Sequence, residues 1–156
     1  MKHVVRFVAA LCLALAIPGV ASAQPDYKTW YLAEGSTGFF EEEILIANPN
    51  GVAANVSIQY LVPVGSPTPA LKQITLPATS RTTVKVNQDI TIHALSAIIT
   101  SDQPIIVERS LYWGGAGRQG GHNTVGVQAP QMEWFLAEGV SNAIFDEFIL
   151  ISNPNN

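Results

Sequence analysis

One segment of the chain is written twice, and this repeat constrains the fold more than any other feature. The sequence WYLAEG at residues 30–35 returns as WFLAEG at residues 134–139, an offset of 134 − 30 = 104. The sequence ILIANPN at residues 44–50 returns as ILISNPN at residues 149–155, an offset of 149 − 44 = 105. This period exceeds the roughly 20–50 residues of solenoid repeats and matches the size of a small domain. The sequence therefore predicts tandem domains.

Between the two copies the pattern is one short strand after another. Runs rich in β-branched and aromatic residues recur at intervals of roughly ten residues, and Asn, Gly, Pro and Ser mark the turns between them. The runs are VSIQYLV, ITL, TTVKV, SAIIT and PIIVERSLYW. Seven or eight such strands predict an all-β fold, an antiparallel β-sandwich of immunoglobulin-like architecture. The Cys–Trp–Cys framework of true immunoglobulin domains is absent, so the exact topology stays open.

Residues 1–23 have the pattern of a signal peptide. Lys2 and Arg6 form a basic region, residues 7–17 are apolar, and Ala-Ser-Ala at residues 21–23 supplies a cleavage site. The apolar run is shorter than the roughly 20 residues that span a bilayer, which argues against membrane insertion after cleavage. We therefore expect a chain that is secreted or held at a bacterial cell surface.

Behind the signal peptide we expect one complete β-sandwich repeat over residues 24–132. Residues 133–156 are then the first strands of a second, incomplete repeat. The sole cysteine, Cys12, leaves with the signal peptide, and an exported chain without disulfides points to a bacterial envelope. The mature chain keeps all 12 acidic and 6 of the 8 basic residues, a net charge of 6 − 12 = −6. This charge argues against nucleic acid as a partner.

Four motifs in fixed order resemble a known kind of repeat. They are WYLAEG at residues 30–35, NPN at 48–50, SRTTV at 80–84 and SDQPIIVER at 101–109. The series resembles an uncharacterised repeat found in tandem on large exported bacterial proteins, and it covers nearly the whole mature chain. The resemblance implies a stalk-like module at the cell surface, sometimes appended to an enzyme, with no catalytic residues. The chain departs from that pattern in carrying one complete unit and a fragment.

The glycine tract at residues 115–120 matches the dinucleotide-binding pattern G-x-G-x-x-G. That mechanism requires a helix to begin at the tract, so that its amide groups meet a pyrophosphate. The segment that follows is strand-like and ends at Pro130. We therefore interpret the tract as a hairpin loop.

The acidic run at residues 41–43 suggests a glycosidase pair or a calcium site. In the second copy Phe148 stands where the third acid of the run would be, so only the first two acids recur. Neighbours on a strand point to opposite faces. We expect a polar strand entrance and no cofactor, and a weak Ca²⁺ site helped by Asp26 or Asp102 is the alternative.

Charged residues in apolar surroundings predict an internal ion pair. Glu34 and its copy Glu138 lie between apolar residues, and Arg109 lies in an otherwise apolar strand. Buried charges persist when they are paired. We therefore expect Arg109 to pair with Glu34 or Glu138 and to fix how the WYLAEG strand docks; no nucleophile or general base accompanies the pair.

Three tryptophans offer a carbohydrate-binding alternative. Trp30, Trp113 and Trp134 are candidates for stacking on sugars, although aromatic residues in the strands of a sandwich more often fill the core. His93 and His122 have no second ligand at metal-binding spacing.

The second copy itself has three explanations. The chain is a piece of a longer tandem array, or the extra strands dock onto a neighbouring molecule by strand addition and build filaments, or they cap an edge of the same domain. We expect a noncatalytic structural or adhesive module, a stalk or spacer, whose partners are neighbouring repeats or other copies of itself. A carbohydrate-binding module and a filament subunit remain the alternatives.

Overall fold

The computed structural model describes residues 25–91, 93–144 and 146–155; the expected signal peptide and Cys12 lie outside the described residues. Within these ranges there are eight strands and two short 3-10 helices, η1 (Val86–Gln88) and η2 (Gly115–Gly117). The strands are β1 (Thr29–Gly35), β2 (Glu41–Asn48), β3 (Ala54–Leu61), β4 (Lys72–Leu76), β5 (Ser80–Lys85), β6 (Leu95–Ser101), β7 (Ile106–Trp113) and β8 (Gly120–Val125). None of the helices among these residues has the length and hydropathy needed to cross a membrane.

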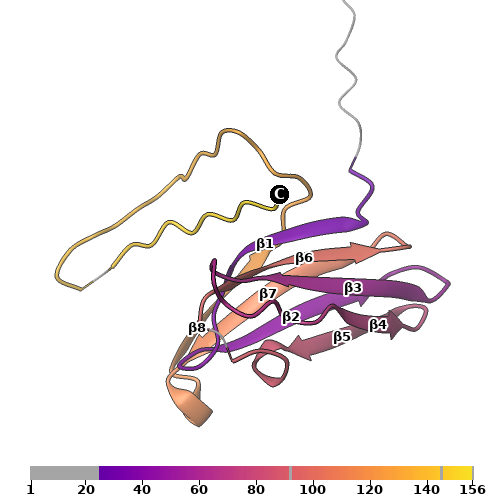
Figure 1. Cartoon of the computed structure of the whole chain (residues 1–156), viewed down its shortest axis with the longest axis horizontal. Helices are drawn as coiled ribbons and strands as arrows, with labels where there is room; N and C mark the ends of the chain where they lie inside the picture. Colours follow the sequence, from indigo (N-terminus) through magenta and orange to yellow (C-terminus); the bar gives the residue numbers. More distant parts are fainter. Residues whose placement is uncertain (1–24, 92, 145, 156) are drawn as a thin grey trace, which may run out of the picture.

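The strands form two four-stranded antiparallel sheets, in the orders β1-β6-β3-β4 and β5-β2-β7-β8. The predicted all-β sandwich is confirmed, and the immunoglobulin-like topology stays a prediction. An isolated bridge between Tyr31 and Val127 ties β1 to the segment after β8. One side of the sandwich is therefore formed by β1 and β8, and the other by β4 and β5 (Figure 1).

The core lies between the sheets and follows from the alternation along each strand. On β2 the side chains of Glu42, Ile44, Ile46 and Asn48 point inward and are buried, whereas their neighbours are only partly covered. The inward face of β3 is likewise apolar, and its Val56, Ile58 and Tyr60 pack in one core with the buried apolar side chains of β1, β6 and β7. A period of two with one apolar face is what a strand in a sandwich requires.

The second copy forms no strand within residues 133–144 and 146–155. It leaves the sandwich at the β1 side, turns back on itself and ends near β1 again (Figure 1), where the hydroxyls of Ser152 and Ser96 of β6 lie 2.8 Å apart. Trp134 is 54% exposed where Trp30 is 4% exposed, and Ile151 is 87% exposed where Ile46 is 1% exposed. The strands that would pair with the second copy are already paired with the first, so the interpretation of residues 133–156 as the first strands of a second repeat stays a prediction.

Candidate functional site

An ion pair between a buried arginine and a partly exposed glutamate joins the two sheets at the β1–β8 side of the sandwich. The pairing of β1 with β6 shifts register between Leu32 and Gly35, and such a bulge turns side chains to a new direction. Arg109 points inward from β7 with 1% of its side chain exposed, and its Nη2 lies 2.7 Å from Glu34 Oε2. The structure therefore brings together two of the three residues expected to share this ion pair. Glu138 is exposed on the tail and does not take part.

A second carboxylate, Glu42, is buried beside the pair. Its carboxyl group packs against Gly35, where a Cβ atom would lie 2.7 Å from Glu42 Oε2. No hydrogen bond of ordinary geometry reaches either carboxyl oxygen from the described part of the chain, although the backbone N–H of Ser36 lies close enough to favour the charged form. Burial raises the pKa of Glu42 from 4.5 to about 8, and the nearby charge of Arg109 opposes this rise. Gly35, the last residue of WYLAEG, has no side chain and so leaves room for the neutral carboxyl group of Glu42.

His122 completes the cluster from β8. Its Nδ1 lies 3.3 Å from Arg109 Nη2, and its Nε2 lies 3.6 Å from Glu34 Oε2. The Nε and Nη1 atoms of Arg109 are buried without a hydrogen-bond partner among the described residues. The guanidinium of Arg109 thus lies between two carboxyl groups and an imidazole. His122 is half-exposed, so this side of the cluster is in contact with solvent. We call Glu34, Glu42, Arg109 and His122 the Arg109 cluster.

Two members of the Arg109 cluster were not predicted from the sequence. Glu42 stands in an acidic run, but alternation with the apolar Ile44 and Ile46 places it on the inward face of β2. That signal was readable. His122 follows a glycine tract, and only its antiparallel pairing with Leu111 places it beside β7. No local sequence signal indicates that pairing.

The other motifs of the repeat also make internal contacts. The Asn48 side chain donates to the backbone oxygens of Val52 (2.8 Å), Leu76 (3.3 Å) and Pro77 (2.9 Å) and so ties β2 to the end of β4. Asn50 donates to the Pro104 oxygen at 2.7 Å.

In the SDQP motif the acidic residue ties the turn after β6 to the start of β3. The Asp102 carboxylate accepts hydrogen bonds from the backbone and side-chain nitrogens of Asn55, both at 2.8 Å. These bonds hold the pKa of Asp102 below its ordinary value.

The tail repeats the local contacts of the first copy. The Asn50 backbone N–H donates to Asn48 Oδ1 at 3.0 Å, and that of Asn155 donates to Asn153 Oδ1 at 3.1 Å. A Cβ atom added to Gly139 would collide with the Glu147 carboxylate, just as one on Gly35 would collide with Glu42. The second copy is therefore arranged locally like the first, although its apolar side chains have no sheet to cover them.

Glu41 and Glu43, the outer acidic pair of β2, both form ion pairs with Arg118. Arg118 Nε lies 3.1 Å from Glu41 Oε2, its Nη2 lies 2.8 Å from Glu43 Oε1, and its guanidinium stacks 4.1 Å from the centre of the Tyr112 ring. The glycine tract forms η2 and leads into β8, in line with a hairpin loop. Asp26 instead accepts a hydrogen bond from the Lys28 backbone. No group of three or more His, Cys, Asp or Glu in the described ranges is placed to hold a metal ion.

The three tryptophans do not form one binding face. Trp30 lies in the core and donates its indole N–H to the Tyr27 oxygen at 3.2 Å, so its proposed role in stacking on a sugar is wrong. Trp113 is 37% exposed and meets Phe40 edge-on, and Trp134 lies on the tail. No ring contact joins any two of the three tryptophans in the described structure.

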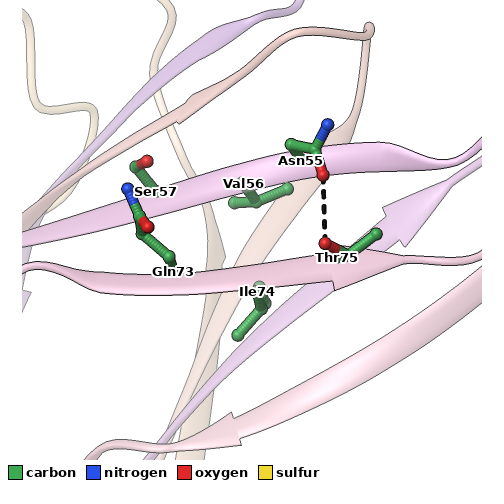
Figure 2. A pocket seen from close by; sticks show the side chains of 6 residues that line it. All are labelled: Asn55, Val56, Ser57, Gln73, Ile74 and Thr75. Carbon is green, nitrogen blue, oxygen red and sulfur yellow. Dashed lines mark hydrogen bonds between the residues drawn. The ribbon is translucent and has the colours of Figure 1, made fainter.

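Two shallow depressions lie at the β3–β4 and β4–β5 sides. The first, of about 290 Å³, lies on β3 and β4 and is lined by Asn55, Val56, Ser57, Gln73, Ile74 and Thr75 (Figure 2). Polar side chains in its lining form hydrogen bonds with each other: the Thr75 hydroxyl donates to Asn55 Oδ1 at 3.0 Å. It has no titratable side chain in its lining. The second is an open groove of about 580 Å³ between β4 and β5.

Comparison with known proteins bears on the fold. No protein-family model and no curated protein matches the chain. Among solved structures it is similar to the crystal structure of Thermotoga maritima 1070, with a TM-score of 0.59 and 14% identity over 65% of this chain and 94% of that one. It is also similar to the Anabaena sensory rhodopsin transducer, with a TM-score of 0.48 and 23% identity over 56% of this chain and 99% of that one. At such identity the first similarity concerns the fold alone.

Proposed function

We propose that this chain is a noncatalytic, exported structural module, a stalk or spacer unit of a bacterial surface protein. The observation that carries the proposal is the use of the repeated motifs. WYLAEG supplies Glu34 to Arg109 and Gly35 to Glu42, and NPN supplies Asn48 to three backbone oxygens. These residues stabilise the sandwich itself, which is the role expected of a motif that recurs in every copy of a structural repeat.

The chemistry of the Arg109 cluster supports the same proposal. A catalytic acid or base has to meet a substrate, whereas Glu42 is 1% exposed, and the partly exposed Glu34 is held at 2.7 Å by the buried Arg109. The exposed member, His122, contacts the ion pair from its edge. Burial of paired charges between two sheets fixes how the sheets are aligned, and that is a structural task.

Export and ligand binding test this proposal together. The full chain is expressed in a bacterial host, and the exported product is analysed by intact mass, limited proteolysis and a glycan array. We expect a product that begins at Gln24, a protease-resistant body that ends near Val127, and no retention on glycans. A chain that stays in the cytosol, or one that binds a sugar saturably, would contradict the proposal.

A carbohydrate-binding module is the second candidate, and one surface feature favours it. Phe39 is 68% exposed, and it continues through Phe40 to Trp113 as a row of aromatic rings at the surface. The rings meet at interplanar angles of 89° and 76°, so they do not form the flat platform on which a sugar ring stacks best. The glycan array therefore includes a Trp113→Ala variant, which would lose binding if this candidate were right.

A further inference from the structure

We propose that the tail, residues 133–156, docks in the groove between β4 and β5 of a second copy of this chain. This inference rests on the proposed structural role and deepens it, because it names the partner and the surface. It is carried by three features of the molecule: the free edges of two strands, the charge of the groove, and the uncovered apolar side chains of the tail.

The groove offers two unpaired strand edges. β4 pairs with β3 alone, and β5 pairs with β2 alone, so each presents one row of free backbone groups. Between them the groove is lined by the apolar side chains of Ile74, Leu76 and Val84. Such an edge is a template for an added strand.

The charge of the groove selects what can bind. Lys72, Arg81 and Lys85 line it, and they are three of the six Lys and Arg residues that follow residue 24. Lys72 is paired with Asp89 at 2.6 Å. Arg81 reaches the Thr83 hydroxyl, and no ion pair of the described structure uses Arg81 or Lys85. Basic side chains on edge strands repel an identical edge and favour an acidic strand.

The tail has the complementary character. Residues 119–156 contain no Lys or Arg and four carboxylates, Glu133, Glu138, Asp146 and Glu147. The same segment exposes large apolar side chains, among them Phe135 (87%) and Phe148 (77%). An acidic segment with uncovered apolar side chains therefore meets a basic groove with an apolar floor.

Docking of the tail at a free strand edge is energetically more favourable than replacement of β1 in a neighbouring molecule. If the tail displaced β1 of a neighbour, one exposed copy would be traded for another with no net burial. Docking at a free edge covers the tail and displaces no strand; it gives up only the hydrogen bond between Ser152 and Ser96, so the burial of the apolar side chains of the tail drives association.

The positions of donor and acceptor imply an open assembly. The tail leaves the body beside β1, whereas β4 and β5 lie at the other side of the sandwich (Figure 1). Contact between two different surfaces does not close on itself after one step, so the expected product is a head-to-tail chain of subunits.

Charge reversal with rescue tests the docking. The acceptor variant carries Arg81→Glu and Lys85→Glu, and the donor variant carries Asp146→Lys and Glu147→Lys. All four substitutions leave the Lys72–Asp89 pair and the Arg109 cluster intact. A Lys28→Glu variant, which reverses one positive charge outside the groove, is the control for a change of net charge alone. Assembly of residues 24–156 is followed by sedimentation velocity over a wide concentration series at low and high salt.

We expect the wild-type chain and the control to assemble with rising concentration, and to do so more weakly at high salt. Each double variant alone should weaken association by roughly tenfold, as expected for the loss of about two surface charge pairs. An equimolar mixture of the two variants should recover mixed assembly.

A wild-type chain that is monomeric at every concentration overturns the docking, whether the tail is free or folds back on its own domain. Assembly that the charge reversals do not weaken also overturns it. Neither result affects the proposed structural role, which depends on export and on the absence of sugar binding.

Discussion

Replacing Glu42 by glutamine should remove a pH-dependent loss of stability from the sandwich. The Glu42 carboxyl is 1% exposed, and burial raises its pKa to about 8. Glutamine keeps the shape and polarity of the neutral acid but does not ionise. It therefore leaves the Glu34–Arg109 pair in place and changes only the titration of this one group.

The sign and the size follow from the two pKa values. Below pH 4.5 the carboxyl is protonated in both the folded and the unfolded chain, so it adds no pH dependence. Between pH 4.5 and about 8 the unfolded chain releases the proton and the folded chain keeps it, so the free energy of unfolding falls as the pH rises. At 1.36 kcal/mol per pH unit the whole interval corresponds to roughly 5 kcal/mol, which relaxation and water penetration reduce. We expect the variant to be about 1–3 kcal/mol more stable than the wild type at pH 7 and equally stable at pH 4.

Urea denaturation at a series of pH values measures this difference. The fluorescence of Trp30, a buried side chain, reports the loss of the core. Glu108→Gln, which changes an exposed carboxylate on the same sheet, is the control and should follow the wild type at every pH. Parallel profiles for the wild type and Glu42→Gln between pH 4.5 and 8, or a variant that is less stable at pH 8, would refute the reasoning.

Three further substitutions test the internal roles of the motifs. Gly35→Ala places a Cβ atom 2.7 Å from Glu42 Oε2 and should cost about 1–3 kcal/mol of stability, whereas Gly51→Ala meets nothing within 4 Å and should be nearly neutral; calorimetry of both variants decides it. Asn48→Ala leaves three backbone oxygens without their donor and should cost about 2–3 kcal/mol, whereas Asn153→Ala, its counterpart on the tail, should leave the midpoint of urea unfolding unchanged. Arg118→Gln removes two exposed ion pairs and should not shift the thermal midpoint measurably; a large shift would mean that the outer acidic pair needs its arginine for folding.

The fold was readable from the sequence because alternation and turn residues agree along the whole first copy. Ile44 and Ile46 on β2 and Val56 and Ile58 on β3 set which face of each strand is inward. The order of the strands in the sheets was not readable. It depends on long-range pairings such as that of β1 with β6, which no local pattern specifies.

The candidate site was partly readable. Glu34 and Arg109 stand out as charges in apolar strands, and the structure places them 2.7 Å apart. Glu42 lies in a run of three acids, and the other two bind Arg118 at the surface. The composition of the run suggested a polar segment, whereas the alternation along β2 correctly indicates that Glu42 points inward. The second copy was expected to form strands because its sequence matches the first, but a strand needs a partner as well as a propensity.

If the repeated motif holds the two sheets together through Arg109, the side chains of Glu34 and Arg109 must be energetically coupled. A double-mutant cycle with Glu34→Gln and Arg109→Met measures this directly, as the coupling free energy between the two side chains in urea denaturation. The account predicts a favourable coupling of about 1–3 kcal/mol, since Arg109 is buried and Glu34 lies 2.7 Å away. A coupling near zero, with both single variants as stable as the wild type, would contradict it and would leave the conspicuous charges of the motif without a structural role.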